Sequence, residues 1–181
     1  ASGPQAIDGF GRRFRYLRLS VTEVCNFRCD YCLPNGYRKT PGASFLTLME
    51  VRRLTQAFAR LGLTKIRLTG GEPTVRRDFT EIVAAIAAQE EIRKVAVTTN
   101  GWNLEKCVQD WRDAGLTHVN VSVDSLDRDV FQRITGHDRL PAVLRGLDLA
   151  MEAGFQSVKV NAVLLRGSIE QELERWADHV A

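Results

Sequence analysis

One joint occurs three times along the chain, and it restricts the possible folds more than any other feature of the sequence. Each copy runs from the end of a predicted helix through a glycine and a large apolar residue into a short link and a strand, over residues 61–67, 114–120 and 153–159. The copies are unequally spaced, which excludes a solenoid. Joints of this kind connect β/α units, and repeated β/α units form a parallel sheet with right-handed crossovers.

The composition is typical of one globular domain. The chain has 181 residues, of which 44% are apolar and 26% charged, and this balance excludes disordered and fibrous proteins. The net charge of +3 is evenly spread, so nucleic acid and anionic membrane surfaces are not expected as partners. No apolar run reaches the roughly 18 residues of a membrane-spanning helix, and residues 1–11 lack the apolar stretch of a secretory signal.

Short β-branched segments alternate with helical ones. The predicted strands cover residues 16–22, 65–69, 94–99, 118–124 and 157–165. Apolar residues at helical spacing predict helices that include residues 51–61, 79–86, 104–111 and 144–151, and a last helix that begins at Ser168. The fold class is therefore α/β.

The predicted strands carry apolar and polar residues in alternation. Parallel strands that are buried on both faces usually consist of continuous apolar runs. The alternation therefore predicts that helices cover one face only and that the polar face lines the concave side of a barrel or half-barrel. This polar face carries three cations, Arg18, Arg67 and Lys159. They either form internal salt bridges with Asp124 or Glu72 or bind an anionic, phosphorylated ligand, and the scarcity of inward carboxylates favours the ligand.

Three of the four cysteines lie within eight residues, directly after the first predicted strand. Cys25, Cys29 and Cys32 have the spacing C-x₃-C-x₂-C, in a loop at the carboxyl end of a strand, where α/β proteins bind their ligands. Three thiolates from one loop can bind three irons of a [4Fe–4S] cluster and leave the fourth iron open. Structural zinc needs four ligands, and no fourth Cys or His is near in the sequence. The pattern favours the cluster, with zinc or no metal as alternatives, and Cys107 is predicted to be a core residue.

The cysteine loop, with Tyr31 just before its third cysteine, resembles the signature of the radical S-adenosylmethionine (SAM) superfamily. The residues at 69–73, Thr-Gly-Gly-Glu-Pro, resemble the glycine-rich motif of that superfamily. Within the superfamily, the chain resembles the GTP 3′,8-cyclases of molybdenum cofactor biosynthesis, from about residue 14 to residue 167. The segments that carry this resemblance are 17–22, 25–34, 66–73, 98–101, 119–124 and 158–161.

The resemblance implies a partial (β/α) TIM-like barrel of the radical SAM type over residues 14–181, after a flexible N-terminal segment, 1–13. It implies two cofactors, a [4Fe–4S] cluster and S-adenosyl-L-methionine. The cluster ligands implied are Cys25, Cys29 and Cys32; the SAM contacts are Tyr31, Gly71 and Ser122; the GTP contacts are Arg18, Arg67, Thr98 and Lys159. The implied enzyme removes the C3′ hydrogen of GTP with a 5′-deoxyadenosyl radical, the sugar carbon then attacks C8 of guanine, and no side chain is required as an acid or base for the abstraction.

The resemblance also implies a longer protein. The family has a further strand that closes the partial barrel and a second three-cysteine cluster site, and neither pattern occurs in these 181 residues. We therefore expect the N-terminal part of a cyclase, truncated before its last strand, which binds one cluster but does not cyclise GTP by itself.

The partners expected are GTP and an electron donor of the flavodoxin type, with a homodimer as an option. An oxygen-sensitive cluster and the absence of an export signal imply a cytoplasmic protein. Two alternatives remain open: another radical SAM enzyme that matures a peptide or a cofactor, and a non-catalytic iron–sulfur or zinc-binding module.

Overall fold

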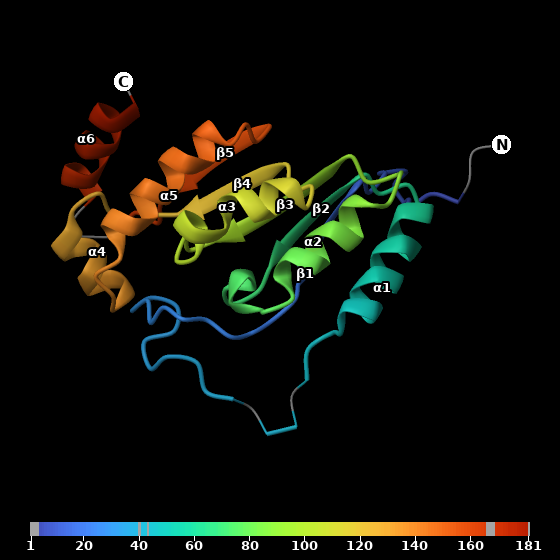
Figure 1. Cartoon of the computed structure of the whole chain (residues 1–181), viewed down its shortest axis with the longest axis horizontal. Helices are drawn as coiled ribbons and strands as arrows, with labels where there is room; N and C mark the ends of the chain where they lie inside the picture. Colours follow the sequence, from blue (N-terminus) through green and yellow to red (C-terminus); the bar gives the residue numbers. More distant parts are fainter. Residues whose placement is uncertain (1–3, 40, 43, 166–168, 181) are drawn as a thin grey trace.

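The computed structural model describes residues 4–39, 41–42, 44–165 and 169–180, and in it five parallel strands form one sheet (Figure 1). The strand order is the sequence order, and every neighbouring pair is parallel. The strands are β1 (Tyr16–Ser20), β2 (Lys65–Thr69), β3 (Lys94–Thr99), β4 (His118–Ser122) and β5 (Ser157–Asn161). The predicted parallel α/β fold is confirmed.

All five strands begin where the sequence predicts, but three of them end earlier. β1 ends at 20 instead of 22, β4 at 122 instead of 124, and β5 at 161 instead of 165. The chain leaves the sheet at these points because side chains capture the loop backbone: Thr22 Oγ1 accepts from Val24 N at 3.1 Å, and Asp124 Oδ1 accepts from Val163 N at 2.9 Å. One more backbone bond to the neighbouring strand follows β1 and β4, from Val21 N to Thr69 O and from Val123 N to Asn161 O, each at 2.9 Å, and the loops begin after it.

In the described ranges, the rest of the chain forms six α-helices and a short 3₁₀-helix, η1 (Pro73–Val75). The α-helices are α1 (Leu48–Arg60), α2 (Phe79–Ala87), α3 (Leu104–Asp113), α4 (Arg128–Thr135), α5 (Leu140–Glu152) and α6 (Ile169–Val180). The sequence did not predict α4, which the chain forms with Asp127 as its N-cap and Phe131 and Ile134 on its buried side. The predicted start at Ser168 lies outside the described residues. None of the helices in the described part of the chain is long and apolar enough to cross a membrane.

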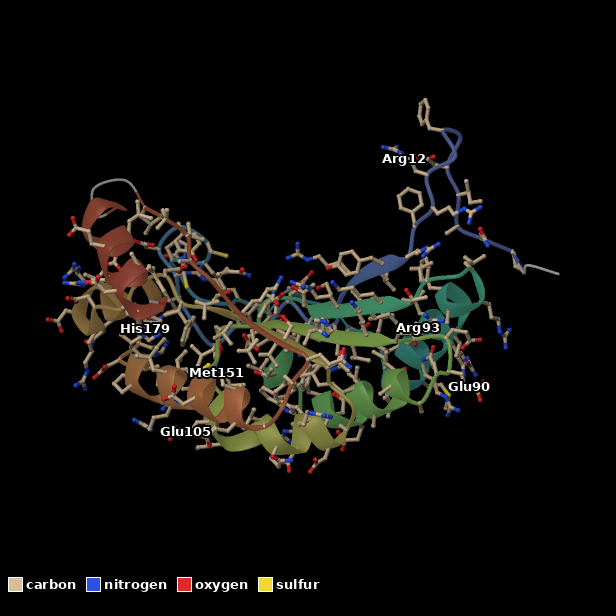
Figure 2. All side chains as sticks on the ribbon, turned by 90° about the horizontal axis from the view of Figure 1, so that it is seen from above. Arg12, Glu90, Arg93, Glu105, Met151 and His179 are labelled. Atoms are coloured by element: carbon tan, nitrogen blue, oxygen red, sulfur yellow. The ribbon has the colours of Figure 1, made fainter. Side chains whose placement is uncertain are left out.

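Helices α1, α2, α3 and α5 cover one face of the sheet, and the opposite face is open (Figure 2). Most of the apolar residues of β1 to β4 that face these helices are buried, whereas in the edge strand β5 Val158 is half-buried and Val160 is exposed. The buried ones are Leu19, Ile66, Leu68, Val95, Val97, Val119 and Val121. The alternation of the strands therefore has the predicted cause, since only the apolar face packs into a core.

The N-terminal residues contact the edge of the domain at the amino ends of the strands. Ile7 and Arg13 form an isolated antiparallel bridge, and Ala6 N donates to Leu61 O at 2.9 Å. This end of the sheet is opposite to the strand ends that carry the cysteine loop.

Candidate functional site

The three clustered cysteines lie around one cavity of about 370 Å³ at the carboxyl ends of β1 and β2. Cys25 and Cys29 are half-buried, and Cys32 is exposed. The remaining lining residues are Ser20, Thr22, Glu23, Phe27, Leu33, Gly70 and Gly71. The structure thus brings the predicted cluster ligands together with Gly71, one of the predicted SAM contacts.

Aromatic packing holds the cysteine loop in place. The Phe27 ring contacts Trp102 and Phe131 edge-on, with centroids 5.7 and 5.9 Å away, and stacks on His137 at 5.7 Å. The loop backbone is also bonded to the end of α4, where Arg28 N donates to Thr135 O at 3.0 Å. The helix that sequence reasoning missed is therefore the support of the cysteine loop, and the Asp127 cap with apolar residues four and seven positions later was the signal for it.

The arrangement of the thiols fits a cluster better than a single ion. A turn brings Cys29 and Cys32 together, with Cys32 N donating to Cys29 O at 3.0 Å. Within the described part of the chain, no three Cys, His, Asp or Glu side chains are placed to hold one metal ion. Zinc requires all its ligands about 2.3 Å from one point, whereas the thiolates of a [4Fe–4S] cluster bind different irons and do not have to converge.

Without a bound cation, the thiols of Cys25 and Cys29 lose their protons less readily than a free cysteine does. Burial raises the pKa of Cys25, and burial together with the nearby Asp124 and Cys25 raises the pKa of Cys29 to about 12. Metal ligands must be thiolates, so loading of the site releases protons from these two groups.

Two glycines allow β2 to end against the cysteine loop. Gly70 has a φ of 153°, and a Cβ there would lie 2.2 Å from Thr22 O. A Cβ on Gly71 would lie 2.5 Å from the carbonyl oxygens of Glu23 and Val24. The close approach is fixed by Gly71 N, which donates to Thr22 O at 2.9 Å. Only glycine fits at these positions.

Glu72 follows the two glycines and is fully buried. Its Oε1 accepts from Thr74 N at 3.1 Å, Thr74 Oγ1 at 2.6 Å and Thr99 Oγ1 at 2.8 Å, and its Oε2 accepts from Asn100 N at 2.5 Å. Burial raises the pKa of this carboxyl, and the four donors oppose the rise. Glu72 thereby ties the glycine-rich turn to the carboxyl end of β3.

Two further predicted SAM contacts lie outside the cavity lining. The Tyr31 hydroxyl donates to Asp124 Oδ2 at 2.7 Å, and burial together with this bond raises the pKa of Tyr31. Ser122 is the last residue of β4 and is paired in register with Asn161. Both residues belong to the same end of the sheet as the cysteines.

The three predicted cations lie on the open face of the sheet. Arg18 is the register neighbour of Arg67, and Lys159 is that of Asn120, which in turn neighbours Thr98. Arg67 Nη1 donates to Thr98 Oγ1 at 3.4 Å, and Arg67 Nε is buried without a hydrogen-bond partner among the described residues.

Salt bridges do not account for these cations. Glu72 and Asp124 accept from hydroxyl and backbone donors, and the ion pairs within the described residues include none of Arg18, Arg67 and Lys159. The described ion pairs therefore do not support the salt-bridge interpretation of the inward cations.

Three more basic residues share the open face by strand alternation, and sequence reasoning missed them. They precede residues already placed on this face by an even number of positions in the same strand: Lys65 precedes Arg67 by two, Lys94 precedes Thr98 by four, and His118 precedes Asn120 by two. Burial and the cations around them lower the pKa of Lys65 and of His118. The five strands place no Asp or Glu on this face, so a strongly positive field covers it.

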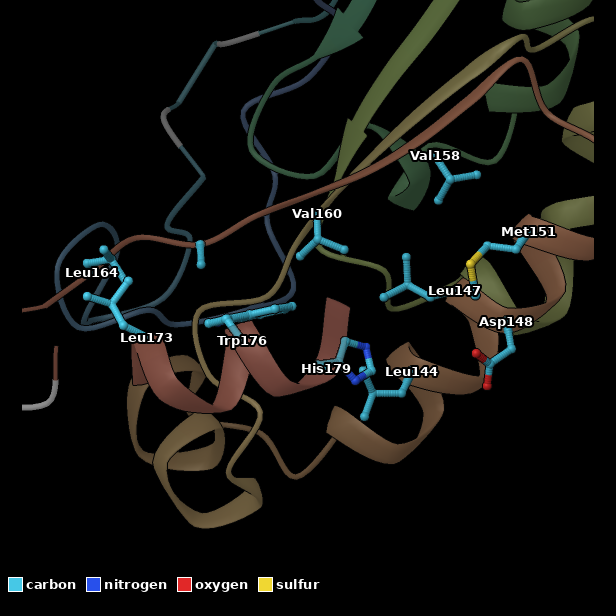
Figure 3. Close-up of a pocket in the computed structure, with 11 residues that line it drawn as sticks. Leu144, Leu147, Asp148, Met151, Val158, Val160, Leu164, Leu173, Trp176 and His179 are labelled. Atoms are coloured by element: carbon cyan, nitrogen blue, oxygen red, sulfur yellow. The ribbon is translucent and has the colours of Figure 1, made fainter. Parts of the chain in front are cut away.

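A second cavity, of about 850 Å³, lies between α5, β5 and α6 (Figure 3). Its walls are mostly apolar, with Leu147, Val160 and Trp176 among them. It contains none of the predicted site residues, so the site assigned to the cofactors is the cysteine cavity.

Residues 19–180 match the Radical SAM superfamily. The chain belongs to this superfamily. Radical SAM proteins use a [4Fe–4S] cluster and SAM, and these are the cofactors of the chain. Enzymes of this superfamily catalyse radical chemistry.

Solved radical SAM structures have the same fold. SuiB from Streptococcus suis bound to S-adenosylmethionine superposes with a TM-score of 0.76 at 20% identity, over 98% of this chain and 38% of that one. HydG, a maturase of the [FeFe]-hydrogenase, gives 0.71 at 19% identity, over 91% and 39%. The enzyme anSMEcpe, with bound AdoMet and the Cp18Cys peptide, gives 0.70 at 15% identity, over 91% and 48%. The chain therefore spans less than half the length of each, and the predicted partial barrel of the radical SAM type is confirmed.

Proposed function

We propose that this chain is the cofactor-binding part of a radical SAM GTP 3′,8-cyclase, the enzyme of the first step of molybdenum cofactor biosynthesis. The observation that carries the proposal is the open sheet face, which presents Arg18, Arg67 and Lys159 with no ion-pair partner among the described residues. A peptide or an uncharged cofactor precursor would not require such a field. The triphosphate of a nucleotide would.

On this proposal, Cys25, Cys29 and Cys32 bind the cluster and leave one iron open for SAM. When bound, the cluster and SAM would supply the radical chemistry that removes the C3′ hydrogen of GTP. The chain contributes the positions of the reactants and the exclusion of water. Gly71 lines the cavity and contacts SAM there on this proposal, and Ser122 lies at the same end of the sheet.

The cations hold GTP by its phosphates. The Arg67 guanidinium donates to Thr98 Oγ1 at 3.4 Å, and its Nε has no hydrogen-bond partner among the described residues. Arginine suits this task because its fork matches the phosphate geometry. Lys65 and Lys94 extend the positive surface toward the amino ends of the strands, so the triphosphate lies away from the cysteine cavity and the ribose lies toward it.

Equilibrium binding of GTP and of guanosine to the chain tests this proposal. GTP is expected to bind and guanosine to bind at least tenfold more weakly. An Arg67→Met change removes a charged, partly buried phosphate contact worth about 1.5–3 kcal/mol, so it should weaken GTP binding about tenfold to a hundredfold. Arg145→Met is the matched control, because Arg145 pairs with Glu105 on the helical side of the domain.

Equal affinity for GTP and guanosine would contradict the proposal, as would equal effects of the two arginine variants. Such a result would favour a peptide- or cofactor-maturing enzyme instead.

A further inference from the structure

The side chain of Asn100, just after β3, is held in one orientation. Its backbone N–H donates to Glu72 Oε2 at 2.5 Å, and its side-chain Oδ1 accepts from Trp102 N at 3.0 Å. An amide oxygen that accepts a bond from a fixed backbone donor cannot exchange places with its nitrogen. The Asn100 amide nitrogen therefore has to face the other way.

That nitrogen faces the cysteine loop. Nδ2 lies 2.8 Å from Asn26 Oδ1 and 4.0 Å from Cys25 Sγ. An amide nitrogen carries two hydrogens, so one is available for each of these acceptors. Among the described residues, no other side chain donates a hydrogen bond to any of the three loop thiols.

We propose that Asn100 is a positioning residue that donates an N–H to the sulfur of Cys25 and makes the cluster bound there easier to reduce. The inference rests on the proposed role of Cys25 as a cluster ligand and is independent of GTP. Hydrogen bonds to the sulfurs are among the factors that set the potential of an iron–sulfur cluster. A donor at the thiolate stabilises the reduced cluster more than the oxidised one, because the reduced cluster carries the additional negative charge.

The bond to Asn26 is a separate, structural contribution. It ties the residue after Cys25 to the end of β3, and Glu72 ties that same point to the glycine-rich turn. Asn100 thus connects the cysteine loop with the turn that carries Gly71. A variant that breaks only the tie to Asn26 separates this anchoring from the effect on the sulfur.

The experiment is a redox titration of the anaerobically reconstituted chain, followed by electron paramagnetic resonance (EPR), with iron and sulfide counted for each variant. The variants are Asn100→Ala and Asn100→Asp, which remove the donor, and Asn26→Ala, which removes only the anchor. Asn100→Asp keeps the size of the side chain and an oxygen that accepts from Trp102 N. Asn103→Ala is the control, because Asn103 lies in the same loop but donates to Thr74 O at 2.9 Å.

Both Asn100 variants are expected to lower the midpoint potential, with the larger shift for the added charge of Asn100→Asp, whereas Asn26→Ala shifts it less and Asn103→Ala leaves it unchanged. Loss of cluster from both Asn100 variants with retention in Asn26→Ala would also support the inference. Equal shifts, or equal loss of cluster, in Asn100→Ala and Asn26→Ala would overturn it, as would unchanged potentials. If the unmodified chain takes up no cluster, the proposed cluster ligands themselves are wrong, and the inference is overturned with them.

Discussion

The buried carboxylate of Glu72 gives the sharpest stability prediction of the fold. Glu72→Ala leaves the backbone N–H groups of Thr74 and Asn100 without their acceptor, because both donate to Glu72. Each buried, unpaired donor costs about 1–3 kcal/mol, and the two hydroxyls can turn to other partners. Release of the buried charge offsets part of the loss. We expect the free energy of unfolding to fall by about 3 kcal/mol.

Glu72→Gln tests the same reasoning with less disturbance. Its amide oxygen can replace Oε1 and keep the bonds from Thr74 and Thr99, but its nitrogen then faces the N–H of Asn100. One donor is left unpaired, so the expected loss is about 1–2 kcal/mol. Glu81→Gln is the control, because Glu81 is exposed on α2 and its replacement should change stability by less than about 0.5 kcal/mol.

Urea unfolding at equilibrium, followed by circular dichroism, measures all three variants in the unloaded chain. The order of stability expected is Glu81→Gln, then Glu72→Gln, then Glu72→Ala. If Glu72→Gln proves as stable as Glu81→Gln, the four hydrogen bonds do not stabilise the turn, and the reasoning fails.

Three more predictions concern the open face and the cysteine end of the sheet. Burial and nearby cations lower the pKa of His118 below its ordinary value of 6.5, so its contribution to stability is complete above pH 6.5 and is lost as the pH falls through the folded-state pKa. Urea unfolding as a function of pH should therefore show a smaller loss of stability on acidification for His118→Asn than for the unmodified chain. Equal losses would refute this. Gly71→Ala would place a methyl group 2.5 Å from two backbone carbonyl oxygens, so we expect it to lower the free energy of unfolding by about 2 kcal/mol, whereas Gly9→Ala, with open space around it, should be neutral. Tyr31→Phe removes the donor to Asp124 and should lower the free energy of unfolding by about 1 kcal/mol in the same assay; an unchanged value would show that this bond does not stabilise the cysteine loop.

The sheet could be predicted from the sequence because its signals are local. A glycine after each helix and a β-branched run after each glycine fix where β2, β4 and β5 begin, and the alternation of Val119, Asn120 and Val121 shows which side is buried. The same alternation places Lys65, Lys94 and His118 on the open face, so these three basic residues were also predictable from the sequence.

The side-chain contacts that hold the cysteine loop could not be predicted in this way. Phe27 is one apolar residue among polar neighbours, and its partners Trp102, Phe131 and His137 are distant in the sequence. The contact of Asn100 with Cys25 likewise joins residues 75 positions apart. Such contacts are formed only when the strand ends meet, and no periodicity in a single sequence encodes them.

The EPR spectrum of the dithionite-reduced, reconstituted chain, with and without added SAM, tests the central claim most directly. If Cys25, Cys29 and Cys32 hold a [4Fe–4S] cluster with one open iron, the unmodified chain should show a cluster signal that changes when SAM is added, and a Cys→Ala change at any of the three should abolish it while Cys107→Ala does not. A signal that is insensitive to SAM, or one that survives the loss of a loop cysteine, would contradict the account.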